Sequence, residues 1–158
     1  MTEKGKIVEF LIKAGAAVNE INDNIGATSL YFAAYQGDVA IMKLLLSAGA
    51  DPDLADNDGF TPLFRAAENN HFSAVRILLE AGAAPSKAPN NGITPLLIAA
   101  AKGCHDVAEY IADWIIATID SPNLQLSCED RAYVWECQSP GNHLEVNELV
   151  EQTNFQAE

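Results

Sequence analysis

The chain has 158 residues, of which 49% are apolar, so it is long enough to bury a hydrophobic core and short enough to predict a single domain. Its net charge of −13 argues against nucleic-acid or anionic-membrane binding and favours a partner with a basic surface. Three cysteines do not suggest a disulfide framework, and no signal-like or membrane-length apolar run occurs, so we expect a cytosolic location.

Residues 1 to 22 predict a single helix. Lys6 to Ile12 places apolar side chains at helical spacing, and the following Ala14-Gly15-Ala16 is typical of a helix end. Residues 23 to 55 predict a turn at Asp23 to Gly26 and two helices, near 29 to 36 and 39 to 47.

Residues 56 to 88 repeat that arrangement. Thr61-Pro62 predicts a helix start, because a threonine hydroxyl accepts from a free amide and proline suits the first helical position. Asn70 is predicted to take a left-handed backbone between the two helices, and Gly82 to end the second one. The apolar stripes of the two helices are Leu63, Ala66 and Ala67, then Val75, Leu78 and Leu79.

Equivalent residues recur at a spacing of 33, as in Gly26, Gly59 and Gly92, and a fixed period of this size predicts stacked copies of one unit. Residues 89 to 120 are the next copy. Their second helix lacks a glycine near position 115, so it is predicted to continue to Asp120 and to present an apolar surface that must be covered. That surface consists of Ile111, Trp114, Ile115 and Ile119.

Residues 121 to 158 show no such repeat and contain one predicted helix, His143 to Gln152. From residue 118 onward the chain carries eight carboxylates against one arginine, a net charge of −7. Two interpretations remain open: a divergent C-terminal cap on the last repeat, or a flexible acidic arm whose helix hooks a partner.

The combination of a turn, Thr-Pro-Leu, Ala-Ala, Leu-Leu and Gly-Ala at a period of 33 resembles the ankyrin repeat over residues 6 to 116. The resemblance implies an all-α solenoid of helix-turn-helix units joined by hairpin loops. Residues 1 to 22 then correspond to the second helix of a partial repeat. Full repeats cover 23 to 55, 56 to 88 and 89 to 120, and 121 to 158 is a non-repeat cap or tail.

The chain departs from the family pattern where a histidine usually follows Thr-Pro-Leu. Tyr31, Phe64 and Leu97 occupy those positions, so we expect the hydrogen bonding that histidine would give between repeats to be absent. Ser29 replaces the expected proline, which predicts a less pre-organised helix.

The partial first repeat has no first helix, so the apolar face of the next repeat is expected to lack its usual cover. That face consists of Leu30, Ala33 and Ala34. Either the start is truncated, or this end pairs with another chain by self-association.

The resemblance also implies that hairpin tips and first helices line a concave groove that binds a partner. Tyr35 and Phe60 are the predicted aromatic anchors, with packing on their own hairpins as the alternative. Arg65 pairs either with a carboxylate of the partner or with Glu68. The other groove positions are Asn24, Ile25, Ala27, Gln36, Asn57, Asp58, Glu68, Asn69, Asn90, Asn91, Ile93, Ala101 and Lys102.

No metal or cofactor site is predicted, because the candidate ligands lack a closely spaced Cys pair. These candidates are Cys104, His105, Cys128, Cys137 and His143. No catalytic motif occurs, and His71 matches a structural position of the family. The carboxylates of Asp51, Asp53, Asp56 and Asp58 lack a loop-closing glutamate and are interpreted as turn residues, not calcium ligands.

We therefore expect a non-catalytic module that binds a segment of another protein. Alternatives are an adaptor or an exported bacterial effector whose tail recruits a second partner, and a metal-binding or enzymatic tail.

Overall fold

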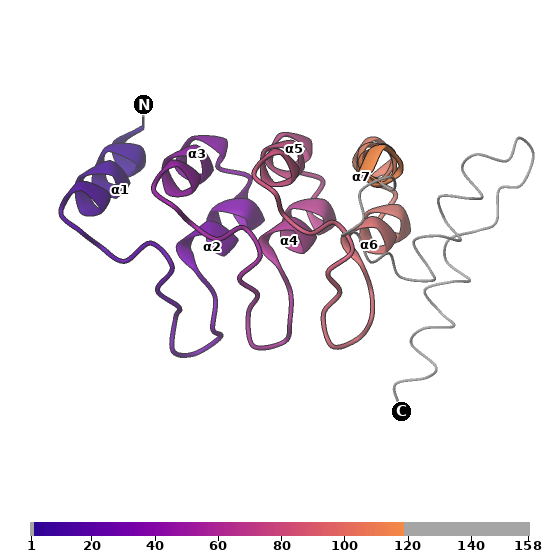
Figure 1. Cartoon of the computed structure of the whole chain (residues 1–158), viewed down its shortest axis with the longest axis horizontal. Helices are drawn as coiled ribbons and strands as arrows, with labels where there is room; N and C mark the ends of the chain where they lie inside the picture. The colour runs from indigo at the N-terminus through magenta and orange to yellow at the C-terminus, as the bar shows by residue number, and fades with distance from the viewer. Residues whose placement is uncertain (1, 119–158) are drawn as a thin grey trace, which may run out of the picture.

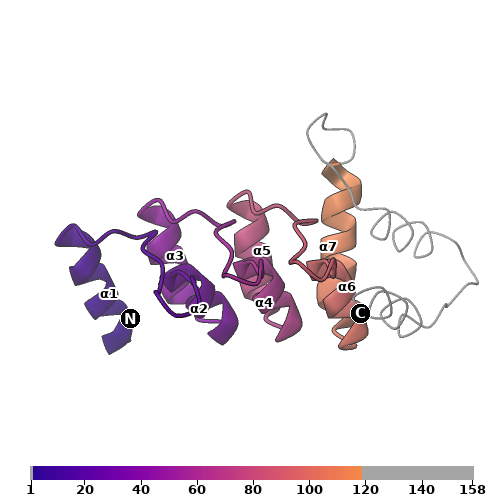
Figure 2. The same ribbon diagram turned by 90° about the horizontal axis from the view of Figure 1, so that it is seen from below.

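The computed structural model describes residues 2–118, which form seven helices in two rows (Figure 1). The helices are α1 (Glu3–Lys13), α2 (Ser29–Gln36), α3 (Val39–Ser47), α4 (Pro62–Glu68), α5 (Phe72–Glu80), α6 (Pro95–Ala101) and α7 (His105–Thr118). α1, α3, α5 and α7 make one row, and α2, α4 and α6 make the other. From below, the members of each row lie side by side (Figure 2). Within residues 2–118 there is no β-strand, and one isolated bridge joins Ile21 to Thr28.

Three buried threonines, Thr28, Thr61 and Thr94, cap the N-termini of α2, α4 and α6. The side chain of Thr61 accepts a hydrogen bond from the Phe64 amide at 3.1 Å, and Pro62 is the first helical residue. Thr28 does the same for α2, although Ser29 stands where α4 and α6 have proline. The predicted helix starts are confirmed, and the cap satisfies an amide that has no partner within the helix.

The second helices also follow the predicted pattern. Asn70 precedes α5 with a φ of 59°, in the left-handed region where Gly37 lies before α3. α7 has 14 residues, compared with 9 in α3 and in α5, so the predicted lengthening of this helix is confirmed as far as Thr118. Ile119 and Asp120 lie outside the described residues.

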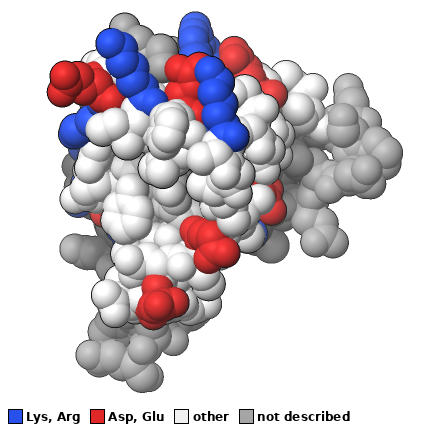
Figure 3. Space-filling view, turned by 90° about the vertical axis from the view of Figure 1, so that its left-hand side faces the viewer, with Lys and Arg blue, Asp and Glu red and all other residues white. Residues whose placement is uncertain are grey.

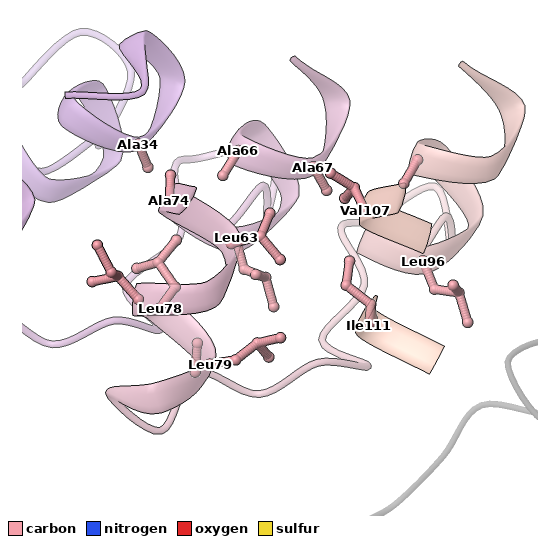
Figure 4. Close-up of a cluster of buried hydrophobic side chains, with 14 of the residues drawn as sticks. Ala34, Leu63, Ala66, Ala67, Ala74, Leu78, Leu79, Leu96, Val107 and Ile111 are labelled. Carbon is pink, nitrogen blue, oxygen red and sulfur yellow. The ribbon is translucent and has the colours of Figure 1, made fainter. Parts of the chain in front are cut away.

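The core lies between the two rows (Figure 4). Leu63 from α4, Leu78 from α5 and Ile111 from α7 are fully buried in one cluster. Ala66 and Ala67 are buried beside them, and their small side chains allow the helices to approach closely. Each buried leucine contributes about 1.5 to 3 kcal/mol relative to exposure, so this common core is a large source of stability.

The expectation of an uncovered face on α2 is wrong. Leu30, Ala33 and Ala34 are all buried in the common cluster, because α2 packs against α3 and α4. Val8 and Ile12 from α1 pack against the cluster. α3 and α4 therefore bury the apolar stripe of α2, while α1 packs mainly against α3.

The apolar surface predicted on α7 is also smaller than expected. Ile111 and Ile115 are fully buried in the common core, and Trp114 is partly buried. The roles predicted for residues 121 to 158, whether cap or arm, lie outside the described residues.

Candidate interaction surface

The hairpin loops project from the row of α2, α4 and α6 and are joined tip to tip (Figure 1). The amide of Asn57 donates to the carbonyl oxygen of Ile25 at 2.9 Å, and the amide of Asn90 donates to that of Asp58 at 3.2 Å. Each bond links one loop to the next, about one repeat along the chain. Because backbone atoms make these bonds, the side chains at the tips can vary without breaking them.

Carboxylates in the loops accept hydrogen bonds from backbone amides. Asp56 Oδ1 accepts from the amides of Asp58 at 3.1 Å and Phe60 at 2.9 Å. Asp53 Oδ1 accepts from the amide of Ala84 in the following repeat at 2.9 Å. The bonds of Asp56 to Asp58 and Phe60 are those of a turn residue, whereas the bond of Asp53 links two repeats.

A hydrogen-bonded cluster lies where α2 meets α4, and its centre is the hydroxyl of Tyr31. This hydroxyl donates to Asp56 Oδ2 at 2.7 Å and accepts from Arg65 Nε at 2.6 Å. Arg65 also lies 2.9 Å from Glu68 Oε2 through Nη1 and 3.6 Å from Asp56 Oδ2 through Nη2. We call Tyr31, Asp56, Arg65 and Glu68 the junction cluster.

The junction cluster supplies hydrogen bonding between repeats without the histidine that the family pattern has at this position. The Tyr31 hydroxyl provides it at this junction, where the family usually has histidine. Phe64 and Leu97, at the same position in later repeats, have no polar side-chain atom and pack with Ile93 instead. The sequence analysis did not predict that Tyr31 makes hydrogen bonds between repeats. The available signal was a hydroxyl-bearing side chain at the position where the family has histidine.

The junction cluster shifts the proton affinities of its members. Burial, and then the hydrogen bond to Asp56, raises the pKa of Tyr31 from 10.0 to about 12. Burial alone would lower the pKa of Arg65, but its hydrogen bonds to Glu68 and Tyr31 outweigh that effect and raise it. The arginine is thus held as a cation between two carboxylates.

Arg65 forms the local pair with Glu68, the second of the two predicted options. Its guanidinium carbon also lies 4.2 Å from the centre of the Phe60 ring. Phe60 is partly buried and packs against Phe64, with ring centres 4.7 Å apart. Phe60 therefore packs within its own repeat, which was the alternative to a free anchor.

The remaining predicted groove positions differ in exposure. Tyr35 is 49% exposed. Ile93, in contrast, is only 8% exposed and packs with Phe64 and Leu97, so its prediction as a contact residue is corrected to a core role. Ala27 is buried too, and Ala101 is partly buried. The exposed positions are Asn24, Ile25, Tyr35, Gln36, Asn57, Asp58, Asn69, Asn90, Asn91 and Lys102.

His71 also links two repeats. Its Nε2 lies 3.1 Å from the carbonyl oxygen of Tyr35, which can only accept, so Nε2 carries the proton. This contact agrees with the predicted structural role.

Among the candidate metal ligands, Cys104 is buried and His105 is exposed. Residues 2–118 contain no group of three or more His, Cys, Asp or Glu side chains placed to hold an ion. Cys128, Cys137 and His143 lie outside the described residues. No helix in the described part of the chain combines the length and the apolar character that crossing a bilayer requires.

A comparison with known protein families matches the family described as ankyrin repeats (3 copies) at residues 1–56 and 49–123. The matched residues cover more than half of the chain, and they include all seven helices described above. Helix pairs in two rows, joined by projecting hairpin loops, are the architecture that the resemblance implied. The chain belongs to the ankyrin-repeat family.

Proposed function

We propose that this chain is a non-catalytic binding module that holds a segment of another protein in the groove between its hairpin tips and first helices. Ankyrin repeats generally mediate protein–protein interaction. The groove we propose is formed by residues 23 to 55, 56 to 88 and 89 to 120, with the exposed positions given above as its contacts.

The observation that carries the proposal is an exposed aromatic residue on a rigid support. Tyr35 is exposed on α2, yet its own carbonyl oxygen is fixed by His71 of the next repeat. The junction cluster and the bonds between tips further fix α2 relative to α4. A rigid aromatic side chain buries a large area with little loss of conformational freedom, so binding here costs little ordering entropy.

The charge of the chain favours a basic partner. Asp58 is exposed at a hairpin tip, and Asp56 and Glu68 outnumber the single Arg65 between them. The net charge of −13 adds a long-range attraction for a basic partner.

The test is affinity capture from a cell extract with the immobilised 158-residue chain, read by quantitative mass spectrometry. Tyr35→Ala should lose a protein that the unmodified chain retains. Phe72→Ala is the matched control, because Phe72 is also an exposed aromatic residue but lies on α5 in the other row. The groove is contradicted if every captured protein responds equally to both changes, or to neither.

A chain ending at Asp120 separates the groove from the adaptor alternative. A groove partner should still be retained, whereas a partner of the acidic tail should be lost. Stoichiometric zinc that disappears with Cys128→Ser would favour the metal-binding alternative instead.

A further inference from the structure

The hairpin tip that precedes α6 carries an asparagine followed by a glycine. Among the asparagines of the chain, Asn91 alone precedes a glycine. Asn91 and Gly92 are both exposed. Gly92 has a φ of 78°, a left-handed conformation that residues with side chains rarely adopt. The turn therefore favours a residue without a side chain at position 92, and this leaves the amide nitrogen of Gly92 unhindered next to the side chain of Asn91.

A sequence difference between two hairpins determines how the Asn91 side chain is held. In the preceding hairpin, Asp56 Oδ1 accepts from the amide of Phe60 at 2.9 Å. Pro89 occupies the position of Asp56 one period later, and it has no side-chain acceptor. The equivalent amide, that of Ile93, donates instead to Asn91 Oδ1 at 3.1 Å. This bond folds the asparagine side chain back along the following backbone, with its Cγ beside the next amide nitrogen.

The same hydrogen bond favours an attack on the side-chain amide of Asn91. When a nitrogen adds to Cγ, negative charge develops on Oδ1. The Ile93 amide already donates to this oxygen, and its position is fixed because the Ile93 side chain is buried with Phe64 and Leu97. A donor that is in place before the reaction stabilises the developing charge without reorganisation.

We propose that Asn91 is a site of spontaneous deamidation. The Gly92 nitrogen gives its proton to hydroxide and attacks Cγ of Asn91. The bond from Cγ to the side-chain nitrogen then breaks, and this nitrogen takes a proton from water and leaves as ammonia. The resulting cyclic imide is opened by water at either of its carbonyl carbons, which gives an aspartate or an isoaspartate at position 91. Water is the only co-reactant, and nothing is oxidised or reduced.

One hydrogen bond restrains the reaction in the folded chain. The Gly92 amide donates to the carbonyl oxygen of Pro89 at 3.0 Å, so this bond must open before the nitrogen can attack. The bond closes a turn at an exposed hairpin tip, where local opening costs less free energy than global unfolding. We therefore expect the reaction to be slower than in the unfolded chain, but to proceed without unfolding.

Deamidation gives this tip the charge that the other tips carry. Residues 23–26 and 56–59 contain aspartate and no lysine or arginine, whereas residues 89–92 are uncharged. Figure 3 views the stack from its N-terminal end, and the loops at the bottom of the view show acidic side chains without basic ones. Asp58 occupies the equivalent position in the preceding hairpin, so an aspartate fits there. Because Asn91 is a proposed groove contact, a stronger attraction for a basic partner rests on the proposed function.

Peptide mapping of the 158-residue chain after incubation at neutral and at mildly alkaline pH tests the proposal. Peptic digestion at low pH avoids further reaction, and electron-transfer fragmentation distinguishes isoaspartate from aspartate. Asn91 should be converted to both, and faster at the higher pH, because the attacking nitrogen must lose its proton. Asn90 is the matched control, since it is exposed in the same loop but precedes a residue with a side chain.

We expect Asn91 to react about tenfold faster than Asn90, or more. Equal rates at the two residues, or an Asn91 that stays intact, would overturn the proposal.

A pair of variants tests the role of the Ile93 amide. Pro89→Asp restores the acceptor that Asp56 provides in the preceding hairpin, so it should release Asn91 Oδ1. Pro89→Ala removes the proline without adding an acceptor, and Asn91 should react about threefold faster in it than in Pro89→Asp. Equal rates in the two variants would overturn the assistance by Ile93. Circular dichroism verifies that both variants fold, and the comparison with Asn90 in the unmodified chain requires neither of them.

The effect on the groove is measured separately. Asn91→Asp carries the charge of the product from the start, and Asn91→Gln carries none. In the affinity capture, the first should retain more of a basic groove partner than the second, and the difference should shrink as salt screens the charge. Equal retention would overturn the effect on binding but not the chemistry at Asn91, which mass spectrometry measures without a partner.

Discussion

The partial repeat at the N-terminus and the complete repeat formed by α4 and α5 use similar residues in very different environments. Phe10 is 71% exposed, and its counterpart Ile77 is 8% exposed. Leu11 is half exposed, and its counterpart Leu78 is fully buried. Residue type therefore does not decide burial in this solenoid; it follows from whether neighbouring units lie on both sides.

Truncating one leucine at a time tests this difference most strongly. Leu78→Ala should lower the free energy of unfolding by about 2 to 5 kcal/mol, because it leaves a cavity in the core. Leu11→Ala should cost about 1 kcal/mol or less, since half of the side chain is already in water. Urea denaturation followed by circular dichroism measures both, and equal losses would show that the assigned repeat register is wrong.

Removing one oxygen atom tests the junction between α2 and α4. Tyr31→Phe should cost about 1 to 3 kcal/mol, because Asp56 and Arg65 each lose a partner in a poorly solvated place. Tyr35→Phe makes the same chemical change on an exposed ring and should change stability by less than about 0.5 kcal/mol. Urea denaturation measures both, and equal stabilities of the two variants would show that the Tyr31 hydroxyl does not stabilise this junction.

A glycine pair compares a loop that contacts its neighbour with one that does not. Gly26 and Gly15 have φ values of 70° and 88°, so alanine at either position is strained by about 1 to 2 kcal/mol. A Cβ on residue 26 would also collide with the side chain of Asn57, whereas a Cβ on residue 15 meets no atom within 4 Å. Gly26→Ala should therefore lower the melting temperature more than Gly15→Ala, and the opposite order would contradict the contact between tips.

Alkaline pH provides the smallest test. The pKa of Tyr31 is about 12 in the folded protein and 10.0 ordinarily, so the folded state retains this proton where the unfolded state loses it. The contribution is complete below pH 10 and is lost as the pH rises towards 12. The loss of stability over this range should be smaller in Tyr31→Phe than in the unmodified chain, as measured by thermal unfolding. A parallel decline in both would indicate that other groups cause it.

The recurring part of the fold was predictable because it depends on local signals. Threonine caps, the left-handed Asn70 and the spacing of apolar residues each act within a few positions, and α2 and α3 lie where they were expected. A period of 33 then fixes how the units repeat.

The exceptions involve contacts between units. The hydroxyl of Tyr31 forms hydrogen bonds with Asp56 and Arg65, which are 25 and 34 residues away in the sequence. No local sequence pattern specifies such contacts. Ile93 was predicted from its position in a loop, yet the aromatic ring of Phe64 buries it. Leu30, Ala33 and Ala34 were expected to lack cover, yet the packing of α2 against α3 and α4 buries them.

The long α7 has a consequence at the last junction. At earlier junctions a loop side chain holds an amide about one repeat ahead, as Asn19 Oδ1 holds Asp51 at 2.9 Å and Asp53 holds Ala84. Ser86 occupies the next such position, and its buried hydroxyl has no hydrogen-bond partner within residues 2–118. One repeat further on lies Ala117, whose amide is already committed to the continuing helix. The lengthened helix thereby removes, at the last described junction, the side-chain-to-amide hydrogen bond that links the repeats at the earlier junctions.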